Sequence, residues 1–330
     1  MPANLTQQYL KAEAEYRRAS TTEDELRCLQ TMLREIPKHK GTDKLQSDLK
    51  RKISQAKKEL GTGKSLAGRG QRQRIARQGA GRIVLVGAPN AGKSQLIAKL
   101  TRATPEVAPY PFTTREPQPA MMPWEDVMIQ LIDTPPITVQ AFDPNILGLL
   151  RGADLALLVI DLGDDEGIEG TQEVLERLQQ TKTRLATESY LDLSDLGVSY
   201  TRTFAVLNKC DLPEFTENIE LLDEFCPLDF ERFQVSAETG QGLKDLAKAI
   251  FMALDVVRVF TKLPGKKEPD YDRPFTISRG GTLLEVAQMI HKDLASNLKN
   301  ARVWGSQVHD GTFVTGDYVL CDRDVVELHM

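Results

Sequence analysis

The stretch GAPNAGKS at residues 87–94 constrains the fold of this chain more than any other. It follows a short apolar run, RIVLV, and precedes a helix-like segment, SQLIAKL. Glycines let successive backbone N–H groups turn toward one point, and the N-terminus of the next helix reinforces this anion-binding nest. The spacing G-x-x-x-x-G-K-[ST] between a strand and a helix therefore predicts a phosphate-binding loop in a parallel α/β sheet.

Each part of this loop has an expected role. Lys93 would neutralise the β- and γ-phosphates of a nucleotide, and the hydroxyl of Ser94 would ligate Mg²⁺. The expected nucleotide contacts are Gly87, Ala88, Pro89, Asn90, Ala91, Gly92, Lys93, Ser94 and Gln95.

Residues 81–264 alternate between short apolar runs and helix-like stretches. The apolar runs lie at 83–86, 127–132, 155–160, 204–207 and 233–235, and the helix-like stretches at 95–100, 171–180 and 243–254. This alternation predicts a parallel sheet with helices on both faces. Ligands bind such sheets at the carboxyl ends of their strands, and each motif described here follows a predicted strand.

Three further segments flank this domain. Residues 1–60 have apolar positions at intervals of three and four, which predicts a helical hairpin. Residues 61–80 are rich in glycine and basic residues, which indicates a flexible linker. The chain restarts at 265–330 with a strand–helix–strand–strand pattern typical of a compact α+β module.

Composition places the chain among soluble proteins, with 41% apolar and 27% charged residues. No stretch approaches the roughly 18 continuous apolar residues of a membrane span, and the polar N-terminus shows no secretory signal. The four cysteines form no C-x-x-C pair, which favours a reducing environment. We therefore expect a cytoplasmic protein that does not act at a membrane.

The charge is unevenly distributed. Residues 38–82 hold 14 Lys and Arg against 3 Asp and Glu, a local charge of +11, so the overall charge of −5 leaves −16 on the rest. A basic segment on an acidic body suggests a polyanionic partner such as RNA. A solvated, disordered tether is the alternative explanation.

Two later motifs indicate guanine specificity. In NKCD, Asp211 can accept two hydrogen bonds from guanine, Lys209 would lie over the base and Asn208 would brace the loops. Adenine would leave that acid unpaired, and such sites discriminate by about 10⁴ or more. In SAETG, which begins with Ser236, Ala237 and Glu238, the N–H of Ala237 can reach the guanine O6.

Between these motifs lie two segments that could respond to the third phosphate. PYPFTT, at 109–114, contains Thr113 and Thr114, and a threonine hydroxyl there can reach Mg²⁺ only while the γ-phosphate is present. An irregular loop without a switching role is the alternative. Asp133 ends an apolar run in the sequence DTPP, where GTPases commonly carry Asp-x-x-Gly.

The loop at 87–94, YPFTT, Asp133, NKCD and SAETG resemble the Obg/DRG GTPases, in which DRG denotes developmentally regulated GTP-binding proteins. EIPKHKGTDKLQSDLKRKISQ resembles the helical N-terminus of the DRG group, and the tail from Arg273 resembles a TGS domain, a β-grasp module also found in threonyl-tRNA synthetase. The resemblance implies a P-loop GTPase sheet with an N-terminal helical extension and a C-terminal β-grasp module. It implies Ser94 and Thr114 as Mg²⁺ ligands, with Asp133 bound to the metal through water.

The chain departs from this family in two places. The DRG proteins carry an extra small domain between the Asp-x-x-Gly acid and the guanine motif, whereas here Asp133 and Asn208 are only 75 residues apart. The expected sensor glycine is Pro136, which has no N–H to donate to the γ-phosphate. Ile137 stands where many GTPases carry the glutamine that positions the attacking water, so glutamine-assisted hydrolysis is excluded.

Asn90 offers another aid to catalysis. It occupies a place where potassium-activated GTPases similar to Obg-like and tRNA-modifying ones carry an asparagine, and its amide oxygen could help hold K⁺ between the phosphates. The alternative is a loop-former that tolerates an unusual backbone.

We expect a slow, K⁺-stimulated GTPase, with Lys93, Thr114 and Asn90 as catalytic candidates. It would act on the ribosome or RNA through residues 38–82 and the TGS module. A non-switching adaptor that binds GTP or GDP remains the other hypothesis.

Overall fold

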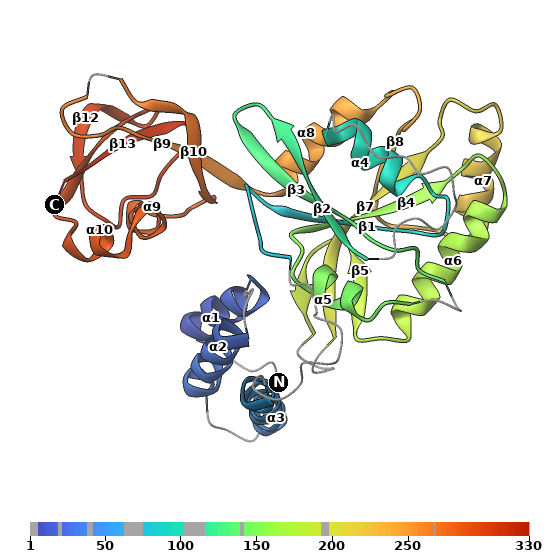
Figure 1. The fold of residues 1–330 in the computed structure, drawn as a ribbon, viewed down its shortest axis with the longest axis horizontal. Helices are drawn as coiled ribbons and strands as arrows, with labels where there is room; N and C mark the ends of the chain where they lie inside the picture. Colours follow the sequence, from blue (N-terminus) through green and yellow to red (C-terminus); the bar gives the residue numbers. More distant parts are fainter. Residues whose placement is uncertain are drawn as a thin grey trace.

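The computed structural model describes residues 6–18, 22–37, 42–62, 75–101, 116–138, 142–192, 198–266 and 268–329. Figure 1 shows three bodies: a group of N-terminal helices, a large central α/β domain and a smaller C-terminal sheet domain. The central domain carries the motifs at 87–94, 208–211 and 236–240. None of the described helices is long and apolar enough to cross a membrane.

The N-terminal body consists of three helices rather than the expected hairpin: α1 (Gln7–Arg18), α2 (Thr22–Glu35) and α3 (Asp43–Thr62). Their apolar faces meet in a small core that includes Tyr9, Leu29, Met32 and Leu49. The structure thus adds one helix to the expected pair, because α1 ends at Arg18 before α2 begins at Thr22.

The central sheet is mostly parallel. Its strands are β1 (Arg82–Val86), β2 (Gln118–Trp124), β3 (Val127–Asp133), β4 (Leu155–Asp161), β5 (Thr183–Ala186), β6 (Tyr190–Leu191), β7 (Ser199–Asn208) and β8 (Glu231–Gln234). The order is β2-β3-β1-β4-β7-β5, with β6 and β8 also paired to β7. Only β2 and β6 pair antiparallel to their neighbours. The strands β1 and β4 are buried along their whole length, as parallel strands between two helix layers must be.

Helices cover both faces of this sheet: α4 (Lys93–Thr101), α5 (Asn145–Arg151), α6 (Glu166–Gln179), α7 (Phe215–Phe225) and α8 (Leu243–Ala253). Alternate residues of β1 show the two layers. Val84 and Val86 pack with Ile146 of α5 and Val174 of α6, whereas Ile83 and Leu85 belong to the core that α4 and α8 complete. This arrangement brings the carboxyl ends of β1, β3, β4, β7 and β8 to one edge.

The C-terminal sheet has the order β10-β9-β13-β11-β12. Its elements are β9 (Val256–Thr261), β10 (Asp270–Ser278), α9 (Leu283–Ile290), α10 (Lys292–Asn297), β11 (Asn300–Gly305), β12 (Val308–Val314) and β13 (Asp324–His329). The expected boundary at 264 falls inside this sheet, in the connection between β9 and β10. Gly265 has a φ of 85°, so the Pro-Gly pair there makes a turn of a hairpin.

The linker at 61–80 divides at the limits of the described residues. Its first two residues continue α3, residues 63–74 lie outside the described ranges, and residues 75–80 lie along the central domain. The N–H of Ala80 donates to the carbonyl of Met128 at 2.8 Å. Arg77 forms an ion pair with Asp154. The end of the basic segment is therefore attached to the central domain by backbone and side-chain contacts.

Candidate nucleotide-binding site

The loop at 87–94 joins the carboxyl end of β1 to the first turn of α4, as expected. Asn90 has a φ of 58° and Gly92 a φ of 90°, which is the left-handed region that turns backbone N–H groups inward. A Cβ atom on Gly92 would lie only 2.2 Å from Nδ2 of Asn208. Glycine at 92 is therefore required both by its backbone angle and by the approach of the guanine motif.

Lys93 is the first residue of α4, and its side chain returns across the loop. Its Nζ donates to the carbonyls of Gly87 at 3.0 Å and Ala88 at 2.7 Å. Burial lowers the pKa of Lys93 from 10.5 to about 8, although the nearby Asp133 carboxylate acts in the opposite direction. A buried ammonium held by two neutral carbonyls is well placed to receive the charge of a phosphate.

Ser94 and Asp133 meet at the end of β3. The hydroxyl of Ser94 donates to Oδ2 of Asp133 at 2.6 Å. One hydroxyl and one carboxylate oxygen side by side are ligands of the hard, oxygen type that Mg²⁺ prefers. The other expected metal ligand, Thr114, and its neighbour Thr113 lie outside the described residues.

The segment after Asp133 turns beneath the phosphate loop. Thr134 is fully buried and donates to the carbonyl of Leu85 at 2.6 Å. After Pro135 and Pro136, the N–H of Ile137 donates to the carbonyl of Gly87 at 3.3 Å. The Ile137 side chain is fully buried in the core. It therefore packs inside the domain and is withdrawn from the solvent where an attacking water would lie.

Asn208 connects three loops at the carboxyl edge. Its Nδ2 donates to the carbonyl of Ala91 at 2.9 Å, and its Oδ1 accepts the N–H of Ala237 at 3.0 Å. This bracing role matches the expectation for Asn208. The N–H of Ala237, expected at the guanine O6, is instead donated to Asn208, because the two loops lie directly against each other.

Lys209 and Asp211 complete the guanine motif. Lys209 has a φ of 67° and forms an ion pair of 2.5 Å with Asp161, the last residue of β4. The Asp161 carboxylate also accepts the N–H of Gly163 at 2.9 Å. Asp211 is exposed in the turn that follows β7. The Lys209 ammonium is thus held at the end of a neighbouring strand, while Asp211 faces solvent.

Sequence reasoning missed Asp161, although an acid at the end of a fully buried strand was a usable signal. It also missed how α4 holds the last loop. Gln95 donates to the Glu238 carboxylate at 2.5 Å, and Lys99 donates to the Glu238 carbonyl at 2.7 Å. Ser236 supports the same loop by accepting the N–H of Thr239 at 3.0 Å. These contacts tie the loop at 236–240 to the helix of the phosphate loop.

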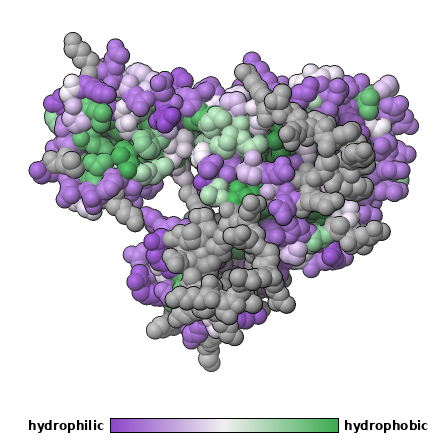
Figure 2. Space-filling view, viewed as in Figure 1, coloured by the Kyte–Doolittle hydropathy of each residue, from purple (hydrophilic) through white to green (hydrophobic). Residues whose placement is uncertain are grey.

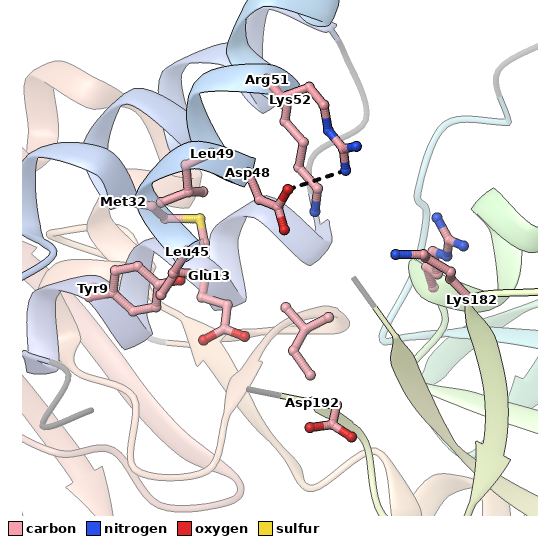
Figure 3. Close-up of a pocket in the computed structure, with 12 residues that line it drawn as sticks. Tyr9, Glu13, Met32, Leu45, Asp48, Leu49, Arg51, Lys52, Lys182 and Asp192 are labelled. Atoms are coloured by element: carbon pink, nitrogen blue, oxygen red, sulfur yellow. Dashed lines mark ion pairs between the residues drawn. The ribbon is translucent and has the colours of Figure 1, made fainter. Parts of the chain in front are cut away.

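A separate cavity lies far from these motifs. It has a volume of about 170 Å³ between the N-terminal helices and the central domain (Figure 3). Lys52 and the Arg51–Asp48 ion pair, at 3.3 Å, line one side, and Lys182 and Asp192 line the other. Burial, and secondarily Arg151, lowers the pKa of Lys52. This cavity mixes cations and acids and brings together none of the predicted nucleotide contacts.

Comparison with known proteins agrees with this geometry. Residues 82–190 match the family model described as "50S ribosome-binding GTPase", and residues 257–330 match the TGS domain. Developmentally-regulated G-protein 2 of Arabidopsis thaliana is 27% identical over 353 residues, covering 88% of this chain and 87% of that protein. Ribosome-interacting GTPase 1 of Saccharomyces cerevisiae is 25% identical over 366 residues, covering 94% and 99%.

The chain is a GTPase with a TGS domain, and it is similar over most of its length to the developmentally regulated GTP-binding (DRG) proteins. Its fold is also similar to the solved structure of the YchF GTPase of Schizosaccharomyces pombe. The TM-score is 0.51 at 16% identity, over 77% of this chain and 98% of that one. The GTPase family match and the DRG-like relatives show a GTP-binding protein, and the solved structure shows that its sheet has the P-loop GTPase fold. The match of the TGS model from residue 257 agrees with a second sheet that begins with β9.

Proposed function

We propose that this DRG-like GTPase hydrolyses GTP slowly and regulates translation as a ribosome-associated protein in the cytoplasm. One observation carries the slow rate: the Ile137 side chain is buried in the core where many GTPases place a water-positioning glutamine. Pro136 supplies no N–H, and that of Ile137 is donated to Gly87. The segment that follows Asp133 thus lacks two of the usual contributions to γ-phosphate recognition and hydrolysis.

The remaining machinery lies in the phosphate loop and the guanine motifs. The Lys93 ammonium would balance the β- and γ-phosphates, and the loop N–H groups would bind their oxygens. Ser94 and Thr114, with Asp133 through water, would hold Mg²⁺, which offsets phosphate charge when bound. Asp211 would accept the guanine hydrogen bonds while Asn208 and Lys209 hold the loop and the base.

Asn90 is the proposed K⁺ ligand, and its backbone angle offers a second, purely structural reason for an asparagine here. A φ of 58° explains an asparagine at this position without any cation, because asparagine tolerates this region better than most residues. Glycine tolerates it too but has no amide oxygen. An Asn90→Gly variant therefore separates a structural role for this residue from a role in holding K⁺.

The ribosome proposal is supported by relatives and by charge. The family model is described as ribosome-binding, and a relative similar over nearly the full chain is named a ribosome-interacting GTPase. The +11 segment at 38–82 provides a polyanion-binding region. Association through that segment should weaken steeply as salt increases, since each phosphate contact releases counterions.

The alternative is a non-switching adaptor that binds GTP and GDP equally and retains only vestigial hydrolysis. The hydrogen bond from Ile137 to Gly87 favours it, because that N–H serves the protein itself. Such an adaptor would bind ribosomes equally in both nucleotide states.

Single-turnover GTP hydrolysis in matched K⁺ and Na⁺ buffers tests the proposal. We expect slow hydrolysis that is faster in K⁺, and loss of the K⁺ effect in Asn90→Gly with nucleotide affinity retained. Equal rates in both buffers would exclude the K⁺ site, and undetectable hydrolysis with tight binding would favour the adaptor. Cosedimentation with ribosomes, with a GTP analogue or GDP, tests the partner.

A further inference from the structure

The outward face of the TGS sheet gathers aromatic rings and cations. Side chains alternate between the two faces of a strand, and Val257, Val259, Ala301, Val303 and Val326 pack in the core with α9. The alternate positions on the other face are Arg258, Phe260 and Lys262 from β9 and its end, Arg302 and Trp304 from β11, Phe313 from β12, and Val325, Glu327 and His329 from β13. Of these, Arg258, Phe260, Val325 and Glu327 are buried, Arg258 against the central domain, so the accessible part of the face lies around Arg302, Trp304 and Phe313. Figure 2 shows that hydrophobic residues, in green, reach the surface of the C-terminal domain in this view.

Strand register places rings beside cations on this face. Arg302 lies opposite Phe313 on one side and Glu327 on the other. The Arg302 guanidinium carbon is 4.6 Å from the centroid of the Phe313 ring, and Nζ of Lys262 is 4.4 Å from that of the Trp304 ring. Both distances are within the range of cation–π attraction.

Two rings of this face are turned to solvent. Phe313 is 58% exposed and Tyr271, whose ring packs edge-on against Phe260, is 59% exposed. Cross-strand pairing explains why a ring would lie beside Arg302, but not why more than half of it meets water. Gly311 lies beside the Trp304 ring, since a Cβ there would be 3.6 Å from the indole nitrogen.

The charges on this face leave one cation available for an anionic partner. Lys262 is balanced by Glu327 at 3.1 Å, and the same carboxylate lies 3.0 Å from His329. Arg302 forms no ion pair with any other described residue and is exposed. Its guanidinium can therefore approach a phosphate while one face remains against the Phe313 ring.

We propose that this face binds single-stranded RNA by stacking unpaired bases on Phe313, Trp304 and Tyr271, with Arg302 contacting the phosphates. Sheets that present rings to solvent bind single strands in this way because every base has a face that can stack. An apolar peptide would need a continuous apolar groove, which Arg302 and Lys262 interrupt here. The proposal rests on the proposed ribosome association and specifies the surface that serves it.

Tryptophan fluorescence of the full-length chain gives a direct test. The chain has two tryptophans, and Trp124 packs against Phe251 in the central domain at 6.2 Å between ring centroids. In a Trp124→Phe background, Trp304 is the single reporter. Titration with a uridine oligonucleotide of about 12 residues should quench its emission saturably, and a duplex of equal length should not. Unchanged emission would overturn the proposal.

A matched pair of variants tests stacking separately from fold. Phe313→Leu removes an exposed ring from the sheet, and Phe225→Leu removes a ring that is 60% exposed on α7. In about 0.3 M salt, where contacts through the basic segment are screened, Phe313→Leu should weaken oligonucleotide binding about tenfold, measured by fluorescence anisotropy. Phe225→Leu should not change it. Equal effects of the two variants would overturn the stacking proposal.

Ribosome cosedimentation separates this proposal from the proposed function. GTP-dependent ribosome binding that is insensitive to Phe313→Leu would overturn the RNA surface and leave the proposed function intact. Oligonucleotide binding that depends on Phe313, in a chain whose ribosome binding ignores the nucleotide, would support the surface and count against the proposed regulator.

Discussion

The nucleotide edge of the central sheet and the junction with the TGS domain are built in contrasting ways. At the edge, Asn208 and Lys93 hold neighbouring loops through neutral carbonyls and N–H groups. At the junction, Arg258 is only 5% exposed and binds three carboxylates, those of Glu125, Asp126 and Asp322. Its guanidinium carbon also lies 5.3 Å from the ring centroid of Phe251.

Backbone strain falls in the same two places. Among the described residues, the non-glycine residues with positive φ are Asn90 and Lys209 at the nucleotide edge, and Glu125, Asp255 and Arg323 around the junction. Such angles persist only where the surrounding contacts hold them. The junction is therefore as closely specified as the nucleotide site, although it follows no sequence motif.

The two regions differ in whether their buried cation is balanced by carboxylates of the protein itself. At the nucleotide edge Lys209 is paired with Asp161, but Lys93 is held by carbonyls that carry no full charge, so an incoming phosphate meets the unbalanced charge of Lys93. The junction balances Arg258 completely within the protein. It joins the turn between β2 and β3 to the TGS domain, and that hairpin leads directly to Asp133.

The largest effect should come from removing Arg258. Loss of one member of a buried ion pair lowers the free energy of unfolding by about 3–5 kcal/mol. Because the carboxylates are partly exposed, we expect Arg258→Ala to lower it by about 3 kcal/mol. Urea unfolding measures the change, and guanine nucleotide affinity should stay unaltered.

Arg279→Ala is the control for this experiment. Arg279 also pairs with an acid at the junction, Asp255 at 2.6 Å, but both side chains are mostly exposed. Its removal should leave the unfolding midpoint unchanged. Similar losses in the two variants would contradict the idea that burial gives Arg258 its importance.

The next effect concerns Pro136 at the nucleotide edge. Pro136→Gly supplies an N–H where the proline has none, and a hydrogen bond to a charged group contributes about 1.5–3 kcal/mol. Preference for GTP over GDP should therefore rise about tenfold or more, measured by titration with both nucleotides.

Pro135→Gly provides the matched comparison, because it loosens the same turn without adding an N–H at the fourth position of the motif. A rise in both variants would attribute the effect to flexibility. No rise in Pro136→Gly would mean that another N–H already serves the γ-phosphate.

The smallest effect is the pH dependence of Lys93. Its pKa of about 8 in the folded chain lies below 10.5, so between these values the unfolded chain binds more protons. The nucleotide-free protein should gain stability as pH rises through this range. Nucleotide binding favours the protonated amine, so affinity should fall above pH 8 by at most about tenfold per pH unit.

Parallel nucleotide titrations of the wild-type chain and Lys93→Met at pH 7 and pH 9 measure this effect. The variant should bind weakly and show the smaller pH dependence. An equal decline in both proteins would assign the titration to a different group.

Much of the fold followed from local patterns. The alternation of apolar runs and helix-like stretches predicted the parallel sheet, and the carboxyl-end rule predicted that residues 87–94, Asp133 and Asn208 would meet. The TGS boundary was displaced because Pro264 and Gly265 mark a turn inside a hairpin, and a turn signal does not say which sheet its strands join.

The sequence by itself determined the chemistry of the nucleotide edge: the phosphate loop, the guanine motif and the missing N–H of Pro136 are properties of residue types at set spacings. Tertiary structure alone decided that Ile137 points into the core, that Ala237 donates to Asn208, and that Arg258 meets Glu125 across 133 residues. The physical reason is that a motif is specified by neighbours along the chain, whereas burial and charge pairing depend on neighbours that only the folded packing supplies.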